Sequence, residues 1–151
     1  MEHIVEERSA GDAELAQLLE AAFAELVGRY GAEGRSQVKD RARYFVVLDE
    51  ERRAVGCGAV QVFGPETEHP GDGEVKRMYV VPPARGRGYA RALLAALEGA
   101  ARSAGHPALR LSTGELQPEA IALYESCGYV RATPWGKYVD QPAVRCYAKS
   151  L

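Results

Sequence analysis

The apolar pattern of this 151-residue chain predicts a mixed α/β sandwich, with helices on both faces of one central sheet of about six to seven strands. Long segments with apolar residues at helical spacing alternate with shorter β-rich segments. Glycines and prolines separate the two kinds of segment. Apolar residues make up 46% of the chain and charged residues 26%, which favours a packed core. The length suits a single domain over residues 1–151.

The first half of the chain predicts an edge strand, a helix and three long strands. Ile4 and Val5 form the edge strand, and Asp12 caps a helix that ends near Gly28. The buried face of this helix consists of Leu15, Leu18, Leu19, Ala22, Phe23 and Leu26. Residues 30–43 are polar and predict a loop or a short second helix. Strands follow at 44–48, 55–63 and 74–81, the first two joined by a polar turn and the last two by a glycine- and proline-rich loop.

The second half predicts two helices and three strands. Helical spacing runs from Ala90 to Ala104 and stops at Gly105, and a short apolar strand follows at 109–112. Pro118 suits the first position of the next helix, which Gly128 ends. Strands are expected at 129–131 and 144–148, with a loop at 134–142 between them.

Composition and charge exclude several classes of function. The formal net charge is −2, from 19 basic and 21 acidic residues, so we expect no nucleic-acid partner. Residues 1–7 are charged, unlike a signal peptide, and no stretch approaches the roughly 18 to 20 apolar residues of a membrane span. We therefore expect a cytoplasmic protein without membrane contact. The three cysteines lack C-x-x-C spacing and the three histidines are far apart, so we expect buried cysteines, surface histidines and no metal.

The most informative stretch is the turn at residues 80–90, between a predicted strand and a predicted helix. Its glycines allow a tight turn that brings backbone N–H groups close together. The helix that follows begins with unpaired N–H groups and the positive end of its dipole, which suits phosphate oxygens. Arg85 and Arg87 add positive charge. A solvated basic turn and an RNA-contacting turn are the alternatives, and the spacing fits neither a Walker loop nor a Rossmann fingerprint.

Two motifs resemble those of the GNAT acetyltransferases. Residues 85–90, RGRGYA, resemble the R/Q-x-x-G-x-G/A signature, and residues 120–129, AIALYESCGY, resemble the late-helix pattern A-x-x-L-Y-x-x-x-G-F/Y. Their order and separation match the family, and the order of elements is similar over nearly the whole chain. One departure is Gln117, which stands where the family often has Asn.

The resemblance implies a fold with a bulge in the fourth strand and a splay between strands 4 and 5. The pantetheine arm of acetyl-CoA would bind in that splay, and its diphosphate at the glycine-rich turn. The cofactor-binding residues that the resemblance implies are Met78, Tyr79, Val80, Arg85, Gly86, Arg87, Gly88, Tyr89, Ala90 and Gln117.

The resemblance also implies the catalytic candidates. Tyr124 would be the acid that serves the departing CoA thiolate, or else a packing residue with its hydroxyl bonded to backbone. Glu74 would be the base that deprotonates the amine, or else a strand-end carboxylate paired with a nearby cation, in which case water is the base. Apart from the resemblance, four aromatic residues would line an acceptor pocket or simply pack: Tyr30, Tyr79, Trp135 and Tyr138.

The expected activity is N-acetylation of a primary amine by direct attack in a ternary complex, with acetyl-CoA as cosubstrate. A small-molecule acceptor is favoured because the chain is short and has no acidic groove. A protein N-terminus or lysine is the alternative acceptor, and a catalytically weak CoA-binding sensor the alternative class. A homodimer, through the edge of the fourth strand or an exchanged C-terminal strand, also fits the predicted fold.

Overall fold

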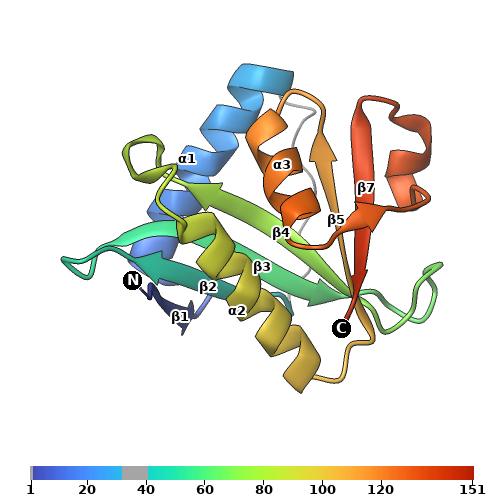
Figure 1. The fold of residues 1–151 in the computed structure, drawn as a ribbon, viewed down its shortest axis with the longest axis horizontal. Helices are drawn as coiled ribbons and strands as arrows, with labels where there is room; N and C mark the ends of the chain where they lie inside the picture. Colours follow the sequence, from blue (N-terminus) through green and yellow to red (C-terminus); the bar gives the residue numbers. More distant parts are fainter. Residues whose placement is uncertain (1, 32–40) are drawn as a thin grey trace. The chain divides into compact units, whose positions relative to one another are not determined.

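A computed structural model describes residues 2–31 and 41–151 of the chain (Figure 1). Its elements are β1 (Ile4–Arg8), α1 (Ala13–Tyr30), β2 (Arg43–Leu48), β3 (Ala54–Val62), β4 (Gly73–Val80), η2 (Pro82–Ala84), α2 (Tyr89–Ser103), β5 (Ala108–Gly114), α3 (Pro118–Ser126), β6 (Val130–Arg131), η3 (Gly136–Asp140) and β7 (Val144–Ser150). The strands hydrogen-bond in the order β1-β2-β3-β4-β5-β7-β6. The predicted mixed sheet with helices is confirmed. The second helix or loop expected at 30–43 falls mostly outside the described residues.

The sheet is antiparallel except for one parallel pair. β1 with β2, β2 with β3, β5 with β7 and β6 with β7 are antiparallel. β4 and β5 are parallel, with Gly73 beside Leu109 and Glu74 beside Arg110. This short parallel register agrees with the predicted splay between the fourth and fifth strands.

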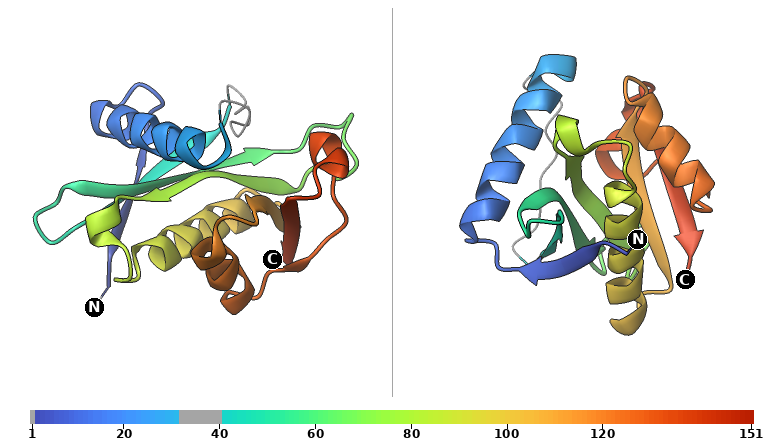
Figure 2. Two further views of the ribbon diagram at one scale, coloured as in Figure 1. Left: turned by 90° about the horizontal axis from the view of Figure 1, so that it is seen from above. Right: turned by 60° about the vertical axis from the view of Figure 1, so that its left-hand side comes forward.

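The chain forms two compact units, which we describe separately: residues 1–61 with 76–97, and residues 62–75 with 98–151. In the first unit, helices cover both faces of the strands (Figure 2). Leu15 and Leu18 of α1 pack on Val46, Leu48 and Cys57. On the other face, a side chain at Gly58 would collide with Met78 and with Leu97 of α2. Because successive strand residues point to opposite faces, Cys57 faces α1 and Gly58 faces α2.

One residue of the predicted buried face of α1 lies elsewhere. Leu15, Leu18 and Ala22 are buried as expected, whereas Phe23 is 37% exposed. A helix advances 100° per residue, so Phe23 lies beyond the stripe that the other three define.

The second unit is built around β5 and β7, with α3 beside them (Figure 1). Tyr147 of β7 donates to Glu125 of α3, so Tyr147 points to the α3 face. Its neighbour Cys146 points to the opposite face, where Phe63, Trp135 and Tyr138 cover it. The region 134–142, expected as a loop, therefore contains the short helix η3 and contributes two buried aromatic side chains to the core.

Candidate functional site

A backbone irregularity interrupts β4 at Arg77. Its φ is 59°, a left-handed conformation that costs a non-glycine residue about 1–2 kcal/mol. The carbonyl of Arg77 accepts the thiol hydrogen of Cys57, with 3.4 Å between oxygen and sulfur. The regular backbone of β4 is thus interrupted directly before Met78, and no sequence motif signals this position. The bulge expected in the fourth strand stays a prediction.

The three strand residues implicated in cofactor binding follow this irregularity. The Met78 side chain fills the space beside Gly58 on the α2 face. Tyr79 points to the α1 face, where it packs against the core and its burial raises the pKa of the phenol. Val80 is buried. Because these side chains are packed, the backbone groups of the segment are what it would offer a ligand, and that role stays a prediction.

The turn between β4 and α2 has the backbone conformation of an anion-binding turn. Gly86 and Gly88 have φ values of 78° and 87°, which side-chain-bearing residues rarely adopt. The first hydrogen bond of α2 runs from the Ala92 N–H to the Gly88 carbonyl. The N–H groups of Tyr89 and Ala90 therefore have no partner within the helix, as at any helix start. The left-handed glycines of the turn and the N-terminus of the helix together suit a diphosphate.

The two arginines of this turn differ in their contacts. Arg85 donates through Nε to the Val80 carbonyl at 2.8 Å and through a terminal nitrogen to Glu25 of α1 at 2.6 Å. Arg85 therefore ties the turn to β4 and α1. The side chain of Arg87 is exposed and borders two cavities of about 450 Å³ each. Ligand binding by either arginine stays a prediction.

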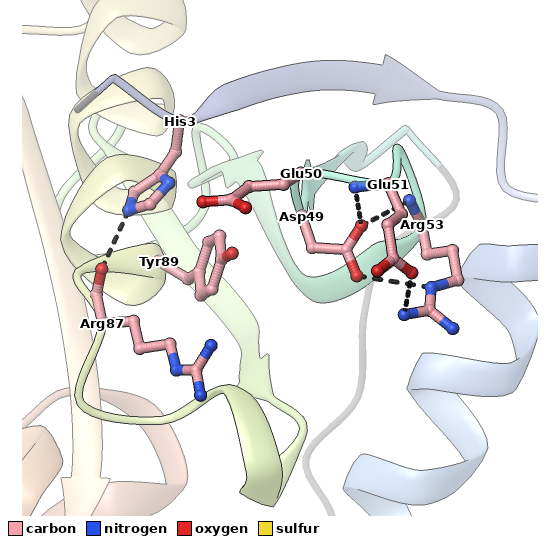
Figure 3. Close-up of a pocket in the computed structure, with 7 residues that line it drawn as sticks. All are labelled: His3, Asp49, Glu50, Glu51, Arg53, Arg87 and Tyr89. Atoms are coloured by element: carbon pink, nitrogen blue, oxygen red, sulfur yellow. Dashed lines mark hydrogen bonds and ion pairs between the residues drawn. The ribbon is translucent and has the colours of Figure 1, made fainter.

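A side chain that no sequence motif singles out also contacts this turn. Nε2 of His3 lies 2.8 Å from the carbonyl oxygen of Arg87, and its ring centroid lies 4.2 Å from that of Tyr89 (Figure 3). A side chain at Gly88 would come within 3.5 Å of the same imidazole. The three histidines expected at the surface, His3, His69 and His106, are partly exposed, and each contacts a turn or an aromatic ring.

The first cavity lies between this turn and the β2–β3 hairpin. Its lining residues are His3, Asp49, Glu50, Glu51, Arg53, Arg87 and Tyr89 (Figure 3). On the hairpin, Arg53 pairs with Asp49 and Glu51. The wall opposite Arg87 is therefore rich in carboxylates, and this part of the cavity does not suit an anion.

In the second unit, Glu74 is a buried carboxylate, 6% exposed, at the start of β4. Its negative charge raises the pKa of the nearby Cys146 thiol, although burial is the larger cause of that shift. Beside it, Arg110 donates through Nε to Asp72 at 2.9 Å, and both side chains are largely buried. The cation near Glu74 on β5 therefore has its own carboxylate partner.

Tyr124 of α3 is also buried, at 6% exposed. Two other buried tyrosines in this unit are hydrogen-bonded: Tyr129 donates to Glu98 at 2.9 Å and Tyr147 to Glu125 at 2.7 Å. Within residues 2–31 and 41–151, no hydrogen bond involves the Tyr124 hydroxyl. Burial raises the pKa of Tyr124 well above its usual value, so the phenol keeps its proton at neutral pH.

Glu74 and Tyr124 belong to opposite faces of the β5–β7 pair. Glu74 stands beside Arg110, which lies over Trp135 on the face of Cys146. Tyr124 belongs to α3, which packs on the other face through Glu125 and Tyr147. Gln117 precedes Pro118 at the start of that helix. The structure thus separates the two catalytic candidates into two layers.

Neither a metal centre nor a membrane span was found in the described part of the chain. Residues 2–31 and 41–151 contain no group of three or more His, Cys, Asp or Glu side chains arranged to hold a metal ion. None of their helices combines the length and hydropathy needed to cross a bilayer.

Comparison with known proteins identifies the family. The model of the acetyltransferase (GNAT) family matches residues 12–129. An IAA acetyltransferase of Azospirillum brasilense is 45% identical over 98 residues, which span 65% of this chain and 61% of that protein. The crystal structure of an acyl-CoA N-acyltransferase from Klebsiella pneumoniae is 31% identical, with a TM-score of 0.83 over 99% of this chain and 97% of that one. A GNAT acetyltransferase of Elizabethkingia anophelis with acetyl-CoA bound shares the fold, with a TM-score of 0.70 and 16% identity over 99% of this chain and 98% of that one. The chain therefore belongs to the GNAT family of acyl-CoA N-acyltransferases.

Proposed function

We propose that this protein transfers the acetyl group of acetyl-CoA to the primary amine of a small molecule, by direct attack in a ternary complex. The observation that carries the proposal is the turn at residues 85–90. Its two left-handed glycines and the start of α2 suit a diphosphate, which is the recognition element that distinguishes CoA from a simple thioester.

Glu74 is proposed to receive the proton of the acceptor amine, directly or through water. A primary amine with a pKa near 10.4 leaves only about one molecule in 2,500 unprotonated at pH 7. A buried carboxylate attracts the ammonium form and accepts one of its protons, which frees the nitrogen lone pair to attack the thioester carbonyl. Glu74 is buried on a strand, so its position is fixed by the sheet and not by a mobile loop.

Tyr124 is proposed to stabilise the departing thiolate as a neutral hydrogen-bond donor. A CoA thiol with a pKa near 8.5 is more acidic than an ordinary phenol with a pKa near 10. Full proton transfer from phenol to thiolate is therefore uphill by about 2 kcal/mol before burial is considered, and burial raises the phenol pKa further. A hydrogen bond without complete transfer avoids this cost, and the unpartnered hydroxyl of Tyr124 supports the role.

The placement of the two residues in opposite layers supports the same chemistry. The amine loses its proton on one side of the reacting carbonyl, while the sulfur gains a hydrogen bond on the other.

A free-thiol assay against a panel of amines tests the proposal, with acetyl-CoA as donor. The panel should hold small amines, amino acids, polyamines and peptides with free N-termini or lysines. Release of CoA only with small amines is the expected result, and release only with peptides would move the acceptor to the protein class.

A thermal-shift titration separates the enzyme from a sensor. Acetyl-CoA at about 100 times its Kd should stabilise the fold by roughly 2.7 kcal/mol. Stabilisation without thiol release from any amine would favour the sensor. No stabilisation at all would remove the CoA proposal.

A further inference from the structure

We propose that the indole N–H of Trp135 recognises a hydrogen-bond-accepting oxygen on the acceptor. The acceptor class is then a small primary amine that also carries a hydroxyl, carbonyl or carboxylate oxygen. This inference rests on the proposed function, because it concerns the amine that the enzyme acetylates.

The first observation is an unsatisfied donor in the core of the second unit. Trp135 is 4% exposed, and its Nε1 has no hydrogen-bond partner within the described residues. Most buried polar groups in proteins are hydrogen-bonded, because a buried donor has lost its water without compensation. A ligand oxygen would supply the missing partner.

The remaining surroundings of the indole are closed by other side chains. The rings of Phe63, His69 and Tyr138 stand edge-on to it, with centroids 5.7, 6.1 and 6.2 Å away. The Arg110 guanidinium lies 5.6 Å above the ring centroid. This packing fixes the orientation of the indole, so its N–H is a rigid recognition element.

Trp135 also lies on the same face of β5 and β7 as the proposed base. Cys146 packs against Trp135, and the charge of Glu74 acts on the thiol of that same cysteine. Glu74 lies beside Arg110 in the β4–β5 register, and the Arg110 guanidinium lies over the indole, so Glu74 and Trp135 belong to the same layer. Arg110 is paired with Asp72. In the inferred complex, Glu74 attracts the nitrogen of the acceptor and Trp135 binds its oxygen.

The chain contains a single tryptophan, which permits an isosteric test. Incorporation of 3-benzothienylalanine in a tryptophan auxotroph replaces Trp135 alone and exchanges its N–H for sulfur with little change in shape. Thermal unfolding of the substituted protein establishes that it is folded. Phe63→Leu is the matched control, since it changes the packing of the same cluster and leaves the indole N–H intact.

The readout is kcat/KM for pairs of amines with and without oxygen. The pairs are ethanolamine against propylamine, and phenylalaninol, phenylalaninamide and phenylalanine against 2-phenylethylamine. The natural protein should favour the oxygen-bearing member by about 10- to 100-fold, as expected when a buried donor is left unpaired by the wrong substrate. The best member of the second series identifies the oxygen as hydroxyl, amide or carboxylate.

In the benzothienylalanine protein, the preference should fall to within about threefold, while Phe63→Leu retains it. An equal loss of rate for every amine would show a structural role for Trp135 and overturn the inference. An unchanged preference, or no preference in the natural protein, would overturn it as well. Absence of turnover with all amines would instead refute the proposed function, and the inference with it.

Discussion

The turn that supports the acetyl-CoA proposal can be tested by one substitution made at two glycines. Gly86 has a φ of 78°, and a methyl group there would meet no atom within 4 Å. Gly86→Ala therefore adds only backbone strain, about 1–2 kcal/mol. Alanine also reduces the conformational entropy of the unfolded chain, which offsets about 0.4–1 kcal/mol of this loss. The net expectation is a loss of about 1 kcal/mol of unfolding free energy.

Gly99 provides the matched control. It lies inside α2, has an ordinary helical φ and also has open space around its missing side chain. Gly99→Ala should therefore raise the unfolding free energy by about 0.5–1 kcal/mol. The two variants should differ by about 1.5–2 kcal/mol, or roughly 3–8 °C in Tm for a chain of this length.

Differential scanning calorimetry with and without acetyl-CoA measures both effects. Gly86→Ala should also reduce the stabilisation by acetyl-CoA, because a turn that relaxes away from the left-handed conformation no longer directs its N–H groups together. Gly99→Ala should retain full stabilisation. Equal Tm values for the two variants, or an undiminished response of Gly86→Ala to the ligand, would refute the reasoning.

Three further predictions follow from individual contacts. Tyr124→Phe should lower kcat about 10- to 100-fold in stopped-flow measurements and change the calorimetric Kd for acetyl-CoA less than threefold. The control Tyr147→Phe should leave kcat unchanged, so equal losses of kcat in the two variants would contradict the role proposed for the Tyr124 hydroxyl. His3→Ala should weaken CoA binding about 2- to 10-fold at unchanged kcat, because one hydrogen bond to the turn is lost; an unaltered Kd would show that the turn holds its shape without it. The free energy of unfolding should fall from about pH 9 to pH 12 by up to 1.4 kcal/mol per pH unit. Burial raises the pKa of the Cys57 thiol to about 12, so the folded protein keeps a proton that the unfolded chain releases. Urea titrations of Cys57→Ala should show a weaker dependence of the unfolding free energy on pH.

The elements and the two motifs were accessible from the sequence because they depend on local patterns. Helix α3 begins at Pro118 as predicted, and the turn glycines at 86 and 88 adopt the backbone that only glycine tolerates well. Periodicity and turn chemistry act over a few residues, so one chain suffices to read them.

The features that remained hidden depend on contacts distant in sequence or on strain. His3 reaches Arg87 across 84 positions, and Arg85 pairs with Glu25 across 60. The left-handed conformation of Arg77 could not be predicted from the sequence, since nothing in its residue type favours that conformation. The segment that holds Trp135 was predicted as a loop, because Pro134, Gly136 and Pro142 interrupt its pattern and its aromatic residues find partners only in the folded unit.

The alternation of side chains along β5 and β7 makes the proposed activity depend on the alignment of these strands. Arg110 lies beside Ala148, and Leu111 beside Tyr147. A slip of β5 by a single position would turn Arg110 toward α3, away from Asp72 and Trp135. Substitutions that loosen this alignment would therefore lower turnover even though Glu74 and Tyr124 are still present.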